Sequence, residues 1–421
     1  MKTFIKRLTG LSIVVALTMY FSAAFAQNGT TYYTVSGVIK DTKTKQNVIF
    51  ASVSVPGTNI GTVSNSDGEF TLKIQKSLNA TEFEIAHLGY QNKKFTIADY
   101  VNKPNQTYFV DPSSIELKEL VVKPVDPRSI VLQAIGKVTE NYSSIPNLLT
   151  GFYRETIKQR RDYVSISEAI VDVYKSPYTI NFDSDRLKIF KGRKSSNVKK
   201  ADTLSVKLIG GPSISLLLDI VKNPDVLLSR ESIDYYDYQM LDIVSIDNKT
   251  NYVISFKPIV NLSYPLYNGK LYITTDKNAI TMAEFSLDLS DENKAVQNFV
   301  KKKPLGLKFV PISTSYLVTY KESNGIYYIN YVRDEVKFSC DWKRRIFKTS
   351  YTVMSEMAVT ERKTDNIEKI PAKESFKPYV VLADKVQDYF DEGFWGEYNT
   401  IVPDESIQSA INKFNRRLKK Q

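Results

Sequence analysis

The chain has 421 residues, of which 42% are hydrophobic and 24% charged, and its formal net charge at pH 7 is +11. This length predicts about two or three domains, each with an apolar core of its own. The single cysteine excludes an intramolecular disulfide framework, and the single histidine excludes a zinc site built on two histidine ligands.

Residues 1–26 have the pattern of a secretory signal peptide. Three basic residues precede an apolar run, and the sequence AFA at residues 24–26 provides a small-x-small cleavage site. Removal of this segment leaves a mature charge of about +8. We therefore expect an exported protein. An exported chain without disulfides is typical of a Gram-negative cell envelope, either in the periplasm or associated with the outer membrane.

Residues 27–122 consist of short apolar-polar alternating segments separated by turns. Alternation is clear in SVSV at 52–55 and EFTLKI at 69–74, as expected of half-buried antiparallel strands. Several such strands within about 80 residues predict a small β-sandwich.

One turn in this region, within GTVSNSDGEFTLKI (61–74), has a spacing that also occurs in calcium loops. With Gly68 at the sixth loop position, the two anchoring positions fall on Val63 and Ile74, which carry no oxygen ligand. Asp67 followed by Gly68 between alternating strands instead predicts a structural hairpin turn.

Several short motifs occur in order over residues 31–122: VSGVIKD, ASVSVPGT, DGEF, LGY and IELKELVV. Together they resemble the carboxypeptidase regulatory-like domain family. The resemblance implies a seven-stranded, transthyretin-like sandwich that is an accessory module and not the peptidase itself. Such modules often precede TonB-dependent outer-membrane receptors, but no receptor plug follows here. His87 departs from the family, which more often has a small residue; it shares strand parity with Phe83 and Ile85, which predicts a partly buried, structural histidine.

Residues 123–360 predict a helix followed by a large antiparallel sheet. Asp126 and Pro127 form a helix-start signal, and apolar residues recur downstream on one helical face. From about residue 149, nine or ten segments alternate and are joined by turn-like sequences. The segment 212–228 interrupts them and predicts a buried helix on the sheet. The chain is thus expected to be mainly β, with a curved sheet or half-open β-barrel and a few helices.

In outline, this second part resembles the unclosed barrels of bacterial lipoprotein carriers and an uncharacterised bacterial envelope domain. No motif matches the carriers residue by residue. Charged residues on the outward strand faces, as in YINYVRDEVKF, disfavour a membrane barrel.

Residues 361–421 predict a linker, a docking segment and a C-terminal amphipathic helix. The aromatic residues Phe390, Phe394 and Trp395 are expected to dock the segment on the sheet. The helix has acids in its first turn and bases in its last. Its apolar face is expected to cap the protein's own core, and attachment to a membrane surface or to a partner's groove are the alternatives. That face comprises Ile407, Ala410, Ile411, Phe414 and Leu418.

The sequence contains no HExxH, GxSxG or Walker phosphate motif. Cys340 lies in a strand pattern without a cationic context and is predicted to be a buried core thiol. No catalytic residue, metal site or cofactor is therefore predicted, and the chain is not expected to be an enzyme.

Two acidic-aromatic clusters are candidates for ligand contact: DYYDY at 234–238 and DEGFWGEY at 391–398. Carboxylates beside aromatic rings bind sugars and, in suitable pairs, cleave them. Basic residues of the C-terminal helix are candidates for contact with a partner or a membrane. The candidate contact residues are Tyr235, Tyr236, Trp395, Glu397, Arg416 and Arg417.

These observations favour a non-catalytic, exported envelope protein. The sandwich would be an interaction module, and the curved sheet would bind a ligand or protein partner, with an apolar, lipid- or lipoprotein-like ligand favoured. One alternative is a carbohydrate-binding protein or a glycan hydrolase that uses Asp391 or Glu397. A second is a structural adaptor at the outer membrane, with peripheral contact through the C-terminal helix. Nucleic acid is not an expected partner.

Overall fold

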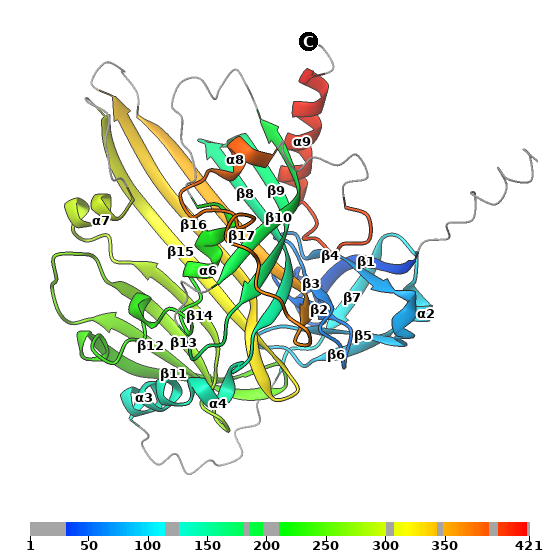
Figure 1. The fold of residues 1–421 in the computed structure, drawn as a ribbon, viewed down its shortest axis with the longest axis horizontal. Helices are drawn as coiled ribbons and strands as arrows, with labels where there is room; N and C mark the ends of the chain where they lie inside the picture. Colours follow the sequence, from blue (N-terminus) through cyan, green and yellow to red (C-terminus); the bar gives the residue numbers. More distant parts are fainter. Residues whose placement is uncertain are drawn as a thin grey trace, which may run out of the picture.

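The computed structural model describes residues 31–113, 126–180, 185–196, 210–299, 307–342, 348–386 and 395–418. Within these ranges the protein is mainly β, with a seven-stranded sandwich beside a ten-stranded antiparallel sheet (Figure 1). The predicted fold class is confirmed. The predicted signal peptide lies outside the described residues.

The sandwich (residues 32–110) consists of a three-stranded sheet, order β4-β1-β7, facing a four-stranded sheet, order β3-β2-β5-β6. Phe70, Phe83 and Tyr108 lie between the sheets and are at most 1% exposed. Its elements are β1 (Tyr32–Asp41), β2 (Ser52–Ser54), β3 (Gly61–Val63), β4 (Glu69–Gln75), η1 (Lys76–Leu78), β5 (Glu82–Ala86), β6 (Lys93–Thr96), α2 (Ile97–Tyr100) and β7 (Gln106–Val110).

The turn between β3 and β4 is structural, as predicted. Gly68 has a φ of +72°, a conformation that glycine adopts without steric cost. The side-chain oxygen of Asn65 accepts hydrogen bonds from the backbone N–H groups of Asp67 (2.9 Å) and Glu69 (2.8 Å). The oxygen is thus used to shape the turn.

The large sheet has the order β10-β9-β8-β17-β16-β15-β14-β13-β12-β11, and all its neighbours are antiparallel. Over the described residues β10 and β11 are unpaired edges, so the sheet is open. Its strands are β8 (Asn147–Gln159), β9 (Asp162–Lys175), β10 (Arg186–Ser196), β11 (Tyr236–Ile246), β12 (Lys249–Pro258), β13 (Tyr267–Thr274), β14 (Ile280–Leu287), β15 (Leu307–Ser323), β16 (Ile326–Trp342) and β17 (Thr349–Lys363).

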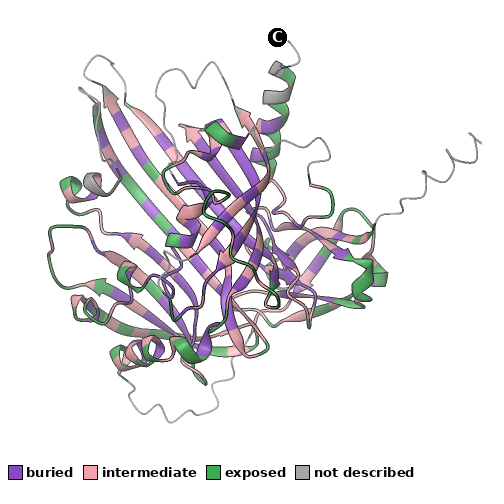
Figure 2. Ribbon diagram, in the orientation of Figure 1, coloured by how far each residue is buried: buried purple, intermediate pink, exposed green. Residues whose placement is uncertain are grey.

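One face of this sheet, called the inner face here, carries the largest apolar core. Short helices cover it, with α3 and α4 at one end and α6 over β16 and β17 (Figure 1). Figure 2 shows the buried residues concentrated along the central strands. As predicted, Asp126 caps α3 by accepting from the N–H groups of Arg128 and Ser129. The covering elements are α3 (Pro127–Gly136), α4 (Val138–Asn141), α6 (Pro212–Leu217), η3 (Pro224–Val226) and η4 (Ile233–Tyr235).

The predicted helix over residues 212–228 is wrong in length, because α6 ends at Leu217. The cause is the fully buried Asp219, whose carboxylate accepts from the hydroxyls of Tyr178 (3.0 Å) and Tyr320 (2.8 Å). These bonds fix the backbone after the helix in a turn, and Pro224 then begins a separate 3₁₀ turn.

The opposite, outer face of the sheet carries the sandwich and the C-terminal tail. In α9 (Glu405–Leu418), Ile407 and Ile411 are buried against Tyr163, Ile166 and Met354. The helix therefore caps the protein's own core, as predicted, while the side chains of Phe414 and Leu418 are not described. The remaining helices are α7 (Glu292–Phe299) and α8 (Leu382–Lys385). Among the described helices, none is long and apolar enough to span a membrane.

Candidate functional site

A short segment of the tail joins the sandwich to the sheet, and we call residues 395–404 the strap. The side chain of Asn399 pairs with the backbone of Lys73 in β4, accepting from its N–H (2.6 Å) and donating to its carbonyl (3.0 Å). The hydroxyl of Thr62 in β3 donates to the carbonyl of Thr400 (3.1 Å). Three hydrogen bonds thus fix the strap to the sandwich.

The other side of the strap is fixed to the sheet by the buried Arg154 of β8, which is 1% exposed. Its guanidinium donates to Glu168 (2.8 Å), to Glu356 (3.0 Å) and to the carbonyl of Ile401 in the strap (2.7 Å). Although burial acts to raise it, the charges of Arg154 and Arg193 lower the pKa of Glu168 below its usual value. The buried charges of Arg154, Glu168 and Glu356 therefore compensate one another, and Arg154 also holds the strap.

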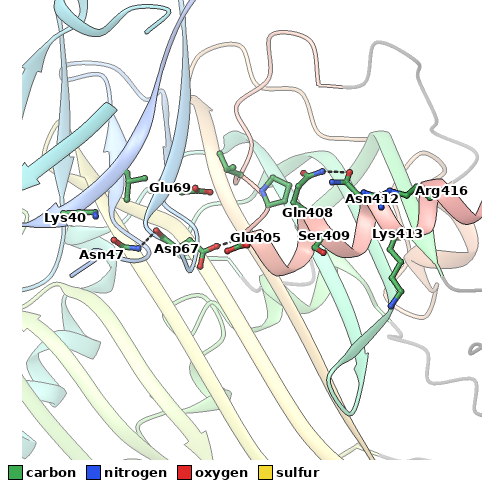
Figure 3. Close-up of a pocket in the computed structure, with 13 residues that line it drawn as sticks. Lys40, Asn47, Asp67, Glu69, Glu405, Gln408, Ser409, Asn412, Lys413 and Arg416 are labelled. Atoms are coloured by element: carbon green, nitrogen blue, oxygen red, sulfur yellow. Dashed lines mark hydrogen bonds between the residues drawn. The ribbon is translucent and has the colours of Figure 1, made fainter. Parts of the chain in front are cut away.

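The hairpin turn of the sandwich contacts the start of α9 (Figure 3). Ser66 donates to Asp404 (2.7 Å), and the carboxylate of Asp67 accepts from the backbone N–H of Glu405 (2.7 Å). A carboxylate at a helix N-terminus is stabilised by the unpaired N–H groups and the helix dipole. The turn that resembled a calcium loop therefore has a second structural role, at the junction between sandwich and tail.

A wide polar cleft of about 1040 Å³ lies beside this contact. Figure 3 shows polar and charged side chains of the sandwich on one side and of α9 on the other. Both signs of charge line it, with Lys40, Lys413 and Arg416 set against Glu69 and Glu405. Such mixed charge does not favour one class of ligand.

A second space, of about 720 Å³, lies directly between the sandwich and the outer face of the sheet; we call it the inter-module cavity. Ile49, Phe50 and Leu88 line it from the sandwich, and Met282 and Leu317 line it from the sheet. Binding sites for small molecules are commonly mostly apolar spaces of this size between domains. This cavity is therefore the candidate site.

The backbone at Phe50 is strained, with a φ of +57°. A bulky residue in the left-handed region costs on the order of 1–3 kcal/mol and persists only where its surroundings hold it. The Phe50 ring stacks on Tyr331 (centroids 5.8 Å apart), and the guanidinium of Arg333 lies 5.1 Å from the centre of the Phe50 ring. The backbone N–H of Phe50 donates to the carbonyl of Ser64 (3.2 Å). The strain thus places an aromatic ring of the sandwich against the sheet.

Strand β15 lines the cavity from Thr314 to Lys321. At about 3.3 Å per residue, this stretch of strand spans roughly 20 Å. Alternate residues of a strand face the same side, so Ser315, Leu317 and Thr319 follow one another along the cavity towards Lys321. The space therefore suits an extended chain.

A cluster of charged groups lies at the Lys321 end of the cavity. Within the described structure, no hydrogen bond or ion pair involves the Lys321 ammonium, and burial lowers its pKa. Asp247 and Glu84 attract it electrostatically, and the Asn92 amide donates to both carboxylates, at 2.6 Å and 3.2 Å. Burial, followed by the charge of Asp247, raises the pKa of Glu84.

His87 also lines this cavity. It is half-buried, as predicted, but lies just beyond β5 and packs edge-on against Tyr90 (5.5 Å). Its Nδ1 lies 2.8 Å from the carbonyl of Leu88, and burial lowers its pKa. Over the described residues there is no group of three or more His, Cys, Asp or Glu side chains placed to hold a metal ion.

Comparison with known proteins assigns the first module. Residues 35–122 match the family model of the CarboxypepD_reg-like domain. All seven strands of the sandwich overlap this match, and we call the sandwich the regulatory-like domain. The resemblance drawn from the sequence motifs is thereby confirmed, and the regulatory-like domain supplies one wall of the inter-module cavity. No curated protein matches the chain.

Several solved structures overlap loosely with this chain. One is a putative outer-membrane lipoprotein-sorting protein domain from Vibrio parahaemolyticus, with 10% identity, a TM-score of 0.25, and coverage of 57% of this chain and 94% of that one. Another is a DUF1329 family protein from Desulfovibrio piger, with 11% identity, a TM-score of 0.24, and coverage of 58% of this chain and 96% of that one. A third is MucB in complex with MucA, with 8% identity, a TM-score of 0.17, and coverage of 58% and 100%. These scores are too low to indicate a shared function.

The candidate residues of the first acidic-aromatic cluster lie on the inner face, away from the regulatory-like domain. Tyr236 begins β11 and is 4% exposed, with its ring edge-on to Phe256 (5.5 Å). Tyr235 ends η4 and is half-buried against the same core. Both side chains are parts of the core.

The candidates of the second cluster lie on the strap. Trp395 packs edge-on against Phe152 (5.2 Å) and under the guanidinium of Arg193 (4.9 Å), and so docks the strap on the sheet. Glu397 is exposed beside a separate cavity of about 440 Å³. Phe390, Phe394 and Asp391 lie outside the described residues.

The basic candidates lie on α9. Arg416 is exposed and lines the polar cleft of Figure 3. The side chain of Arg417 is not described. The structure therefore places the candidate residues in three separate regions of the molecule.

Sequence reasoning missed the apolar lining of the inter-module cavity. A signal was present in the run VIF at 48–50, which is continuous where the neighbouring strand alternates. Its second residue, Ile49, is 40% exposed, and an exposed isoleucine beside a strained phenylalanine indicates a surface built for contact. Cys340, by contrast, is 2% exposed in an apolar cluster, as predicted.

Proposed function

We propose that this protein is a non-catalytic binding protein of the cell envelope, in which the regulatory-like domain and the curved sheet together enclose the ligand. The observation that carries the proposal is the inter-module cavity, about 720 Å³ in volume and lined by apolar side chains of both modules. The apolar side chains that line it and the stretch of β15 along it favour an apolar chain as the ligand. The signal-peptide pattern of residues 1–26 supports export to the envelope.

The docking of the two modules supports a fixed site more than a flexible spacer. The strap is hydrogen-bonded to both modules, and Val63 of β3 packs into one apolar cluster with Phe152, Tyr331 and Ile401. A pre-formed site binds with a smaller ordering cost than a mobile one.

The test is titration of the mature protein with N-phenyl-1-naphthylamine, a neutral apolar dye that fluoresces when it leaves water. We expect saturable binding by the wild type. The substitution Ala86→Trp places an indole in the cavity, and we expect it to weaken dye binding at least tenfold. Thr107→Trp, on an exposed position of β7, is the matched control and should bind as the wild type does.

Thermal unfolding shows whether each variant folds. If Ala86→Trp fails to fold, Ser315→Trp fills the cavity from the sheet side instead. Absence of dye binding to the wild type, or unchanged binding to a folded cavity-filled variant, would overturn the proposal.

Two alternative functions receive less support. Hydrolysis of a glycan by the second acidic-aromatic cluster would need a pair of carboxylates, and within the described residues the cluster contributes only the exposed Glu397. An adaptor bound to the membrane through α9 could not use Ile407 and Ile411, which are already buried on the sheet.

A further inference from the structure

We infer that the inter-module cavity selects an acyl chain whose head is a neutral hydrogen-bond acceptor, an ester or amide carbonyl, over a chain that ends in a free carboxylate. This inference rests on the proposed function and specifies the chemistry of its ligand. The residues that carry it are Lys321, Asp247 and Glu84.

The first step is the missing partner of Lys321. Its ammonium has three N–H donors, and in the described structure none of them makes a hydrogen bond or an ion pair. The residue lies half-buried at one end of the cavity, and this burial lowers the pKa of its ammonium. A ligand that brings an oxygen to this point supplies the acceptor that the protein lacks.

The second step is the charge around that ammonium. Asp247 and Glu84 already attract it, and Asn92 holds these carboxylates in place from the regulatory-like domain. The two carboxylates therefore compensate the positive charge of Lys321 at longer range, although the ammonium makes no hydrogen bond with either of them. A carboxylate head would be drawn to Lys321 but repelled by both acids, whereas a carbonyl oxygen accepts the hydrogen bond without this repulsion.

The third step is the wall that leads away from Lys321. Leu317 of β15 and Met282 of β14 face Phe50 and Ile49 across the cavity. These four side chains offer contact to methylene groups, while Ser315, Thr319 and Arg333 are polar members of the same lining. An acyl chain that lies along the four apolar side chains, with its head at Lys321, uses the apolar part of this lining.

The experiment compares three ligands with the same chain length: lauramide, laurate and dodecane. Each displaces N-phenyl-1-naphthylamine from the mature protein at pH 7.5 and constant ionic strength. We expect lauramide to displace the dye at a concentration roughly tenfold below that of either other ligand, as one added charge-assisted hydrogen bond implies. Lys321→Met should bring lauramide to the level of dodecane and leave dodecane unchanged.

Two further variants complete the design. Lys321→Arg keeps a donor at this position and should retain part of the preference for lauramide. Lys257→Met removes an exposed lysine outside the cavity lining and should behave as the wild type.

Three results would overturn the inference while leaving the proposed function intact: strongest binding of laurate, equal binding of all three ligands, or a lauramide preference that survives in a folded Lys321→Met variant. Failure of the wild type to bind the dye or any of the ligands would instead remove the proposed function itself.

Discussion

Two buried carboxyl groups on the inner face of the sheet make the protein's stability depend on pH. Glu155 on β8 and Asp334 on β16 are 3% and 6% exposed. Both are in register with Ser355 on the intervening strand β17, so they lie in one row across the sheet. Tyr153 donates to Glu155 (3.1 Å) and Ser355 donates to Asp334, but within the described structure neither acid has an ion pair with a base.

Burial raises the pKa of Glu155 from 4.5 to about 8, and burial raises that of Asp334 from 3.8 to about 6. Hydrogen bonds from Tyr153 and Ser355 act in the opposite direction without cancelling the effect. Both folded-state pKa values lie above those of an unfolded chain. At a pH between the unfolded-state and folded-state pKa of either group, the folded protein holds a proton that the unfolded chain has released. The free energy of unfolding therefore falls as pH rises through this range.

The magnitude follows from the pKa of Glu155. A tenfold change in proton affinity corresponds to about 1.4 kcal/mol, so the change in pKa from 4.5 to about 8 amounts to on the order of 5 kcal/mol of unfolding free energy. Most of this loss falls between pH 5 and pH 8. Asp334 adds a further loss, complete by about pH 6.

The assay is urea unfolding of the wild type and of Glu155→Gln at pH 5 and at pH 8. We expect the wild type to have a clearly lower midpoint at pH 8 than at pH 5. Glutamine keeps the shape of the protonated acid and cannot ionise, so the variant should lose most of this difference. Glu335→Gln, on the next position of β16 and 43% exposed, is the matched control and should retain the wild-type difference.

Equal wild-type midpoints at the two pH values would show that Glu155 is ionised at little cost in the folded protein. A Glu155→Gln variant with the full wild-type difference would show that other groups cause it. Either result would refute the reasoning from burial.

Two further predictions concern the buried charge and the close strand contacts. Arg154→Met should lower the unfolding free energy by about 3–5 kcal/mol in urea titrations, because Glu168 and Glu356 lose a buried partner. A loss below about 1 kcal/mol would contradict this. Gly269→Ala should destabilise the protein strongly in the same assay, because a Cβ at this position would lie 2.1 Å from the carbonyl oxygen of Glu284. Gly136→Ala in α3 is the control: its Cβ would meet no neighbouring atom, so the variant should be as stable as the wild type or slightly more stable. Equal effects of the two alanines would count against the close contact at Gly269.

Local patterns predicted the elements that depend on local physics. Alternation predicted the strands of both modules, and the Asp126-Pro127 start signal predicted the beginning of α3. The helix after Gly211 was predicted too long because apolar residues recur through residue 228. The residue that ends it, Asp219, is held by tyrosines from distant strands, and no local pattern contains that information.

The candidate site could not be predicted in the same way, because two modules build it. Phe50 and Leu317, on opposite walls of the cavity, are 267 residues apart in the chain (317 − 50). Lys321 sits in an alternating strand like any outward lysine, and only the docking of the regulatory-like domain brings Glu84 close to it. The chemistry of the site is thus a product of tertiary packing.

The docking of the modules and the occupation of the cavity are thermodynamically linked. The inter-module cavity has walls from both modules, so a ligand within it binds the docked arrangement better than an undocked one. Such a ligand stabilises the docked form by an amount that grows with its concentration relative to its dissociation constant. The strap favours the docked form without a ligand through its contacts with Arg154 of the sheet and Lys73 of the sandwich. Loss of the strap contacts should therefore weaken ligand binding even though no strap residue lines the cavity.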